Sequence, residues 1–279
     1  MIVALALGLL SCGVQTDISH PLLVRTAIAT LSCKAVPDTE QAGLYPVRWQ
    51  EGDQISINGT VSQPLPDSYD GLSDACFAFA SLEGAAPLNM LYPACAGGDR
   101  VTLDGAKPAM YAVTAAPEET ALFHQLTAGI RIELYGSLQL ASLSLQADAG
   151  ETIGGDFSVS FPSGGLTVLE GTSILSRPFG TPAALSATEP LILFWFIHPG
   201  TCSDGLTLQA ASPSGDTRTW HFGRGTSLQK GKMYAVEPIS FVADIPNIPD
   251  DTDDPKDPTT DGFDVSIEEM TGFSYEYQL

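Results

Sequence analysis

Turn signals recur every eight to twelve residues along most of this chain, with short segments of alternating apolar and polar residues between them. Gly52-Asp53, Asn58-Gly59 and Pro213-Ser214-Gly215-Asp216 are examples whose residue types favour tight reversals. The chain holds 27 glycines and 20 prolines, and only 16% of its residues are charged. No stretch longer than about ten residues has the apolar spacing of an amphipathic helix. The sequence therefore predicts an all-β protein of the β-sandwich class.

The chain is long enough for two such sandwiches. Its 279 residues are 44% hydrophobic, which supplies core material for two domains of roughly 100 and 120 residues. Residues 20–35 begin the first block with an alternating, strand-like pattern. Pro117 and two glutamates follow that block, and a second block begins near Ala121. We expect an N-terminal β-sandwich domain at residues 13–118 and a C-terminal β-sandwich domain at residues 119–243.

Three features of the second block predict particular strands. Residues 122–134 and 138–147 are expected to form two longer strands. Residues 157–161 and 166–169 flank a Pro-Ser-Gly-Gly turn and predict a hairpin. Residues 191–197 are apolar on both faces, which is typical of a strand in the middle of a sheet.

The chain begins with an apolar run that ends at Leu9-Leu10-Ser11-Cys12. This run is too short to span a bilayer, so a signal segment (residues 1–12) is favoured over the alternative, a fragment of a buried strand. The last four residues of the run resemble a bacterial lipobox. That resemblance implies cleavage before Cys12, lipidation of Cys12 and durable membrane attachment, because more than one acyl chain would be added.

The charge of the chain excludes one class of partner. Twelve basic residues stand against 33 acidic residues, which gives a net charge of −21. Such a chain repels the phosphates of nucleic acid and has no basic stretch to bind them. We therefore expect no nucleic-acid partner.

Catalytic and metal-binding motifs are absent from the sequence. The four histidines, His20, His124, His198 and His221, are scattered, and no zinc-protease, nucleophile-elbow or phosphate-loop motif occurs. The Asp-rich run at residues 250–257 lacks the glycine at the sixth position and the glutamate at the twelfth position of a calcium-binding loop. We therefore expect no enzymatic activity, no metal and no cofactor.

The cysteines leave two interpretations open. If Cys12 carries lipid, then Cys33, Cys76, Cys95 and Cys202 remain, without the C-x-x-C spacing of a zinc or redox site. Disulfides are permitted outside the cytoplasm, and four cysteines allow three full pairings. Buried free thiols are the equal alternative.

The C-terminal part of the chain combines a linker with strand-like sequence. Residues 244–261 hold four prolines and seven aspartates, which keep a linker extended through stiffness and charge repulsion. Residues 262–279 then alternate in polarity, as a strand does, and can dock on their own domain or on another molecule. The apolar positions of this candidate donor strand are Phe263, Val265, Ile267, Phe273, Tyr275, Tyr277 and Leu279.

Several short motifs, in order along the chain, resemble those of the Bacteroidales fimbrillin-like (Mfa-like) lipoproteins, the type V pilins. The lipobox agrees with this family as well. The motifs are Trp49-x-x-Gly52-Asp53-x-Ile55-Ser56-Ile57-Asn58-Gly59, Tyr92-Pro93, Tyr111-Ala112-Val113, Phe123-His124-x-Leu126-x-Ala128-x-Ile130-x-Ile132 and Lys230-Gly231-Lys232-Met233-Tyr234.

The resemblance implies two tandem transthyretin-like β-sandwich domains in a lipoprotein at the bacterial cell surface, attached to the outer membrane. It implies a role in fimbrium assembly and cell adhesion, with other fimbrial subunits as partners and a host or bacterial surface protein or glycan as a further ligand. In stalk subunits of the family, an arginine-specific protease removes the N-terminal strand, and the C-terminal strand of another subunit fills the groove. Arg25 and Arg48 are the candidate cleavage sites here, and Arg25 is preferred. Anchor-type members remain uncut and keep their lipid.

A surface lipoprotein that binds glycans is the alternative function. Trp49, Trp195 and Trp220 are the side chains that would stack on sugars. Trp195 lies within an apolar run, which favours a core position, whereas Trp49 and Trp220 are candidates for partial exposure. A row of exposed aromatic side chains would favour this alternative, and a groove matched to the C-terminal strand would favour polymerisation.

Overall fold

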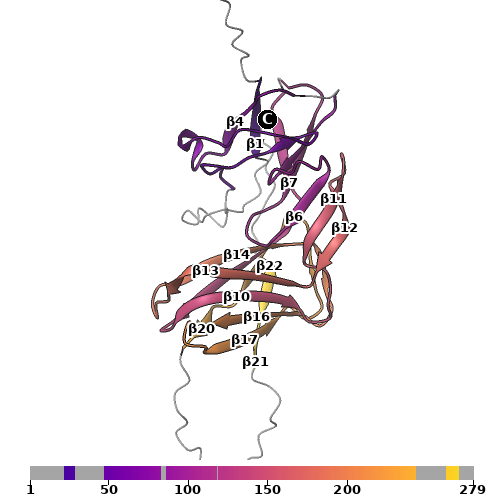
Figure 1. The fold of residues 1–279 in the computed structure, drawn as a ribbon. Coiled ribbons are helices and arrows are strands. Elements are labelled where there is room, and N and C mark those ends of the chain that lie inside the picture. Colours follow the sequence, from indigo (N-terminus) through magenta and orange to yellow (C-terminus); the bar gives the residue numbers. More distant parts are fainter. Residues whose placement is uncertain (1–21, 29–46, 83–85, 118, 243–261, 270–279) are drawn as a thin grey trace, which may run out of the picture.

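The computed structural model of the chain describes residues 22–28, 47–82, 86–117, 119–242 and 262–269. This part of the chain is built of strands, with one short 3₁₀ turn at Asp67–Tyr69 and no α-helix. Figure 1 shows the strands gathered into an N-terminal group and a C-terminal group. The prediction of an all-β protein is confirmed.

The N-terminal group is organised around a seven-stranded sheet whose core is aromatic. The buried side chains of this first core cluster include Trp49, Phe77, Phe79 and Phe123. Alternation along β4 has the expected period of two, because its odd-numbered positions are buried and its even-numbered positions are not. The strands in spatial order are β3 (Thr60–Val61), β2 (Ser56–Ile57), β5 (Leu88–Tyr92), β7 (Met110–Thr114), β8 (Ala121–Gln125), β1 (Leu22–Ile28) and β4 (Asp74–Phe79).

A three-stranded sheet connects the two groups. Its strands are β12 (Gly165–Thr172), β11 (Gly154–Ser160) and β6 (Arg100–Leu103). The predicted hairpin around the Pro-Ser-Gly-Gly turn is confirmed as β11 and β12, which pair antiparallel. β6 comes from the first block of the sequence, yet it pairs with β11 from the second block.

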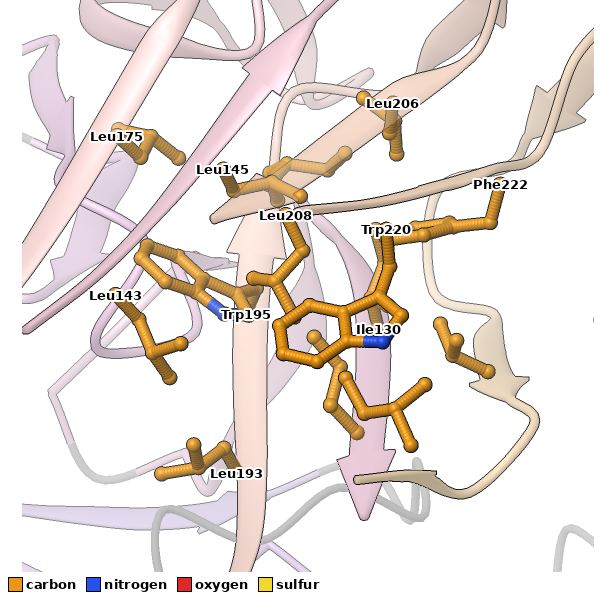
Figure 2. Close-up of a cluster of buried hydrophobic side chains, with 14 of the residues drawn as sticks. Ile130, Leu143, Leu145, Leu175, Leu193, Trp195, Leu206, Leu208, Trp220 and Phe222 are labelled. Carbon is orange, nitrogen blue, oxygen red and sulfur yellow. The ribbon is translucent and has the colours of Figure 1, made fainter. Parts of the chain in front are cut away.

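The C-terminal group is a sandwich of two five-stranded sheets with a core of its own. Figure 2 shows the middle of this core, where Trp195 and Trp220 lie among leucine and isoleucine side chains from both sheets. One sheet contains β13 (Ile174–Ala184), β10 (Gln139–Ala147), β16 (Leu206–Ala211), β17 (Thr217–Phe222) and β21 (Gly262–Val265). The other contains β14 (Leu191–Ile197), β9 (Ala128–Gly136), β19 (Met233–Val236) and β22 (Ile267–Glu269), with β20 (Ile239–Phe241) paired to β9. A small two-stranded sheet, β15 (Gly200–Cys202) with β18 (Thr226–Leu228), completes this part.

Residues 122–134 do not form the single strand that the sequence predicts. They contain β8 and β9, which belong to different sheets. The strands separate at Leu126, whose N–H donates to the carbonyl of Ala109 (2.7 Å) and whose side chain is buried in a third core cluster. The sequence does not reveal where the chain passes from one sheet to the other, because the apolar pattern continues through β8, Leu126 and β9.

The prediction that residues 191–197 lie in the middle of a sheet is wrong. β14 is the edge strand of its sheet. Its apolar character on both faces has another cause, because Trp195 and its alternate neighbours pack into the C-terminal core while Phe194 and Phe196 pack into the first core cluster. β14 therefore lies between two cores.

Candidate functional site

β1 occupies a position inside the N-terminal sheet, between β8 and β4. It pairs antiparallel with β4 over six positions and parallel with β8 over three positions. We call the position between β8 and β4, occupied by Leu22–Ile28, the β1 slot. Residues 29–46, which follow β1 in the sequence, lie outside the described part of the chain. A strand with partners on both sides contributes hydrogen bonds to two neighbours, so its loss would expose the edges of both.

The walls of the β1 slot belong to the aromatic core. Phe77 and Phe79 on β4 and Phe123 on β8 are fully buried. The indole of Trp49 packs edge-to-face on Phe77, with ring centroids 5.0 Å apart, and on Phe123, with centroids 5.7 Å apart. Leu22 and Val24 stand opposite Phe79 and Phe77 in the register of the sheet. The slot therefore opens directly on the core of the N-terminal group.

Backbone hydrogen bonds and a buried carboxylate fix the segment that carries Trp49. The Trp49 N–H donates to the carbonyl of Leu72 (2.8 Å). Asp53, which is 2% exposed, accepts hydrogen bonds from the Tyr92 hydroxyl (2.9 Å) and from the Gln50 N–H (2.9 Å). Burial, reinforced by the charge of Asp53, raises the pKa of Tyr92, so its hydroxyl stays protonated as a donor.

The Lys107 ammonium completes this network, 2.8 Å from Asp53 Oδ1. The sequence predicts only a turn at Gly52-Asp53 and does not reveal this buried partnership. The only sign of it in the sequence is the presence of Asp53 in the same short motif as Trp49. The buried Asp53 carboxylate holds this segment in place, because removing it would leave the buried Tyr92 hydroxyl without its acceptor.

The two candidate cleavage residues differ in their place relative to the β1 slot. Arg25 lies in the middle of β1, opposite Cys76 of β4. Arg48 lies after β1 in the sequence, half-buried between the buried side chains of Val47 and Trp49. Cys12 lies outside the described residues. Cys33 does too, whereas Cys76, Cys95 and Cys202 are free thiols.

The first half of the candidate donor strand pairs with the chain's own C-terminal sandwich. β21, which contains Phe263 and Val265, runs parallel to β17, and β22 runs antiparallel to β19. Val265 and Ile267 pack against the C-terminal core. Glu269 forms an ion pair with Lys232 at 2.9 Å. The segment therefore adds one strand to each sheet of the sandwich, while the remaining candidate positions, Phe273, Tyr275, Tyr277 and Leu279, lie outside the described residues.

The three tryptophans are buried, which removes the proposed sugar platform. Trp49, Trp195 and Trp220 are 1%, 0% and 4% exposed. The core position expected for Trp195 is confirmed. Trp49 and Trp220, the two candidates for partial exposure, are also buried, because each packs in a core cluster. In the described part of the chain the exposed large hydrophobic side chains are all aliphatic: Val61, Leu72, Leu122, Val168, Leu169, Ile174 and Val242.

The described residues contain no group of three or more histidine, cysteine, aspartate or glutamate side chains that could hold a metal ion. Among the same residues, no helix is long and apolar enough to cross a membrane. The described histidines lie apart. His198 stacks on Phe157 with ring centroids 4.8 Å apart, and burial lowers the pKa of His198 and of His124. His221 Nδ1 lies 2.8 Å from the hydroxyl of Thr207.

Solved structures of three proteins illustrate what the chain resembles. No family model matches the sequence, and no curated protein sequence does. A candidate cell adhesion protein from Bacteroides ovatus is 15% identical, with 80% of this chain and 91% of the other covered and a TM-score of 0.47. A candidate cell adhesion protein from Bacteroides fragilis is 10% identical, with 80% and 92% covered and a TM-score of 0.47.

The third is the tip fimbrial protein Mfa3 from Porphyromonas gingivalis. It is 9% identical, with 78% of this chain and 94% of the other covered and a TM-score of 0.35. Two of these neighbours are thus candidate cell adhesion proteins, and the third is a fimbrial protein.

Proposed function

We propose that this chain is a fimbrial subunit or fimbria-associated surface lipoprotein of the fimbrillin-like family, which acts in fimbrium assembly and cell adhesion by exchanging strands between copies. The observation that carries the proposal is the position of β1. This strand lies between β8 and β4 in the N-terminal sheet, and it comes before Arg48 in the sequence. One cut would therefore separate it from the rest of the sheet and open a groove onto an aromatic core.

Cleavage after Arg48 is the better choice for this step. A cut there separates all of Leu22–Ile28 from the remaining chain, together with Cys12 and Cys33. A cut after Arg25 would leave Thr26, Ala27 and Ile28 attached, and these are the three positions that pair with β8. The sequence alone favours Arg25, and the pairing of β1 reverses that preference.

The C-terminal segment has two parts in this proposal. Residues 262–269 anchor the segment through β21 and β22, which pair with the chain's own sandwich. Residues 273–279, with Phe273, Tyr275, Tyr277 and Leu279 alternating, form the donor that enters the β1 slot of another copy. An edge with unpaired N–H and C=O groups recruits such a strand, and its alternate side chains fill the groove.

The remaining parts of the proposal follow the sequence. Cys12 carries lipid that attaches the immature chain to the outer membrane. The two groups of strands are two tandem transthyretin-like domains joined to the tail by the acidic linker. The pairing of β8 with β7 and β1 supports a division after Gln125 rather than at residue 118. Glycan binding loses its main support because all three tryptophans are buried.

A competition experiment tests the proposal. Protein that begins at residue 13 is treated with a trace of arginine-specific protease, and polymers are detected as a ladder on a denaturing gel loaded without boiling. A synthetic peptide with the sequence of residues 17–31, added in excess, should suppress the ladder because it refills the β1 slot. A scrambled peptide of the same composition is the control. Absence of any ladder after complete release of β1 would overturn the proposal.

A further inference from the structure

β12 is an edge strand, with no partner on its outer side among the described strands. It pairs antiparallel with β11, and the three-stranded sheet ends with it. Figure 1 shows the hairpin of β11 and β12 at the outer side of the molecule. An edge strand presents a row of backbone N–H and C=O groups that another strand can pair with. The occupant that fits this edge is therefore an extended chain.

Apolar side chains gather along this edge. The described residues have seven exposed large hydrophobic side chains, and three of them, Val168, Leu169 and Ile174, fall within a stretch of seven residues. Val168 is 44% exposed, although it stands opposite the fully buried Phe157 of β11. Directly paired residues of two strands point to the same face, so Val168 lies on the core-facing side of the sheet. A further strand beside β12 would cover it.

Most of the features that keep sheet edges from pairing are missing from β12. Charged side chains, lysine above all, and proline protect such edges. Of the eight residues of β12, Glu170 alone is charged and none is proline. Leu169 forms a bulge, because the pairing with β11 shifts by one residue there, and bulges also protect edges. The bulge leaves Gly165–Val168 as a regular stretch that is open to pairing.

We propose that β12 pairs with β12 of a second copy, antiparallel and across a two-fold axis that passes through the position of Thr167. The contact uses neither the β1 slot nor the C-terminal segment, so it goes beyond the proposed function. In this arrangement Thr167 faces its own counterpart, and Leu166 of each copy faces Val168 of the other. The same segment supplies both sides of the contact, as in most symmetric dimers.

Charge favours a second copy of this strand as the occupant. Residues 165–169 carry no charge, so two copies of this stretch can face each other without opposing like charges. A strand with a charged residue at this place would bring that charge against Leu166 or Val168, away from water and without a counter-charge in the regular stretch. Glu170, beyond the bulge, would stand opposite Gly164 of the second copy.

The alternation of β12 selects the register. Leu166 and Val168 lie on the core-facing side, because their partners on β11 are buried in the third core cluster. Thr167 lies on the other side, opposite Ser158. A two-fold axis perpendicular to the sheet keeps the core-facing sides of both copies together only if it passes through a residue position and not between two positions. The possible centres in the regular stretch and its ends are therefore single residues.

A centre at Thr167 gives the best set of opposed pairs. Two leucine–valine pairs form on the core-facing side, and a threonine–threonine pair forms on the other, both of which stabilise antiparallel strands. A centre at Val168 would place Glu170 opposite Leu166. A centre at Leu166 would leave Val168 opposite Gly164, which has no side chain to cover it.

The contact is small, so it is weak between single molecules. A few paired residues bury far less than the roughly 1,200 Å² of a stable interface. In a polymer formed by strand exchange, a step that rests on the proposed function, the same contact would repeat along two neighbouring polymers and bind much more strongly as a set. We therefore expect β12 to hold polymers side by side.

Sedimentation equilibrium of the uncut protein that begins at residue 13 tests the contact without strand exchange, because β1 stays in place. We expect a dimer at high protein concentration. More dimer should form as salt is added, because the net charge of −21 makes the copies repel each other and salt screens this repulsion. A protein that remains monomeric up to about 1 mM, or a dimer that salt weakens, would overturn the proposal.

Two lysine variants locate the contact. Val168→Lys should raise the dissociation constant of the dimer about tenfold, because each copy loses the burial of one apolar side chain. Leu72→Lys is the control, since Leu72 is 46% exposed, lies outside β12 and undergoes the same change of charge. Unchanged urea midpoints show that both variants fold. An equal effect of the two substitutions would refute the assignment to β12.

Cysteine cross-linking tests the register. In a background with Cys76→Ser and Cys95→Ser, Thr167→Cys should give a disulfide-linked dimer on mild oxidation, since directly opposed Cβ atoms lie about 4.5–5.5 Å apart and a small adjustment reaches disulfide distance. Peptide mapping by mass spectrometry should show a bond that joins position 167 of both copies. Glu170→Cys should give none, because its two copies lie six positions apart in this register. A bond from Glu170→Cys with none from Thr167→Cys would overturn the register.

The polymer gives a separate readout. After cleavage by an arginine-specific protease, Val168→Lys should form the same ladder as the unchanged chain, but electron microscopy should show its polymers singly and those of the unchanged chain side by side. Absence of a ladder in both would contradict the proposed function and leave the dimer of the uncut protein standing. Side-by-side polymers of the Val168→Lys variant would overturn the role of β12.

Discussion

Replacing Arg48 with lysine should abolish polymerisation in the presence of an arginine-specific protease, whereas replacing Arg25 with lysine should leave it intact. Lysine keeps the positive charge and removes only the cleavage site. Arg25 lies in a strand that is hydrogen-bonded on its β4 side, and a cut there leaves the three β8-paired positions of β1 attached. The expected effect of the Arg48 change is all or none, because a chain that keeps β1 has no open slot.

Cleavage at Arg48 also requires local opening of the chain. The next residue, Trp49, is buried, and its backbone N–H and carbonyl are bonded to Leu72 and Gly71. We therefore expect slow cleavage of the folded protein and a product whose first residue is Trp49, identified by N-terminal sequencing. Polymerisation of the Arg48→Lys variant, or its loss in the Arg25→Lys variant, would refute this assignment of the cleavage site.

Replacing Gly105 with alanine should lower the free energy of unfolding by about 3 kcal/mol, from roughly 1–2 kcal/mol of left-handed backbone strain and a similar cost of overpacking. Gly105 has φ +82°, and a Cβ there would lie 2.7 Å from Trp195 Cε3 and 3.0 Å from Leu175 Cδ1. Its carbonyl accepts hydrogen bonds from the Phe196 N–H and from the Arg177 guanidinium, both at 3.0 Å. The loop that carries Gly105 therefore joins the N-terminal strands to β14.

A second glycine with a similar φ serves as a control that distinguishes backbone strain from side-chain crowding. Gly98 has φ +79°, and a Cβ there would meet nothing within 4 Å. Gly98→Ala should therefore cost only the backbone strain, about 1 kcal/mol. Urea denaturation followed by tryptophan fluorescence measures both variants. Equal losses in the two variants would show that the contact of Gly105 with Trp195 does not contribute to the stability.

Local patterns in the sequence predict the strands well, but they do not predict which strands meet. The turn residues Asn58-Gly59 and Pro-Ser-Gly-Gly predict the reversals between β2 and β3 and between β11 and β12. The pairing of β6 with β11 joins residues more than fifty positions apart. Such pairings depend on three-dimensional packing, which no local pattern encodes.

The prediction for β14, which rested on its apolar residues, was wrong for a related reason. A strand that is apolar on both faces is predicted to lie in the middle of a sheet. β14 is instead an edge strand whose two faces pack against two different core clusters. Periodicity reports that both faces are covered and does not report what covers them.

The candidate site was predictable in part. Arg25, Arg48 and the alternating tail can be named from the sequence, and β1 is visible as a strand. The sequence does not show that β1 lies between β8 and β4, because its partners are far away in the chain. It also does not show that the strands of Phe263, Val265 and Ile267 pair with the C-terminal sandwich of the same chain. An alternating apolar pattern suits pairing within the chain and pairing with another molecule equally well.

Truncation after Glu269 tests the central claim most directly. This variant keeps β21 and β22 on their sandwich and removes residues 270–279, which include the donor, so its urea midpoint should match that of the full chain. After cleavage by the arginine-specific protease, the full chain should form a ladder on an unboiled denaturing gel, and the truncated chain should remain a single species. A ladder from the truncated chain would contradict the account, because polymerisation would then proceed without residues 273–279.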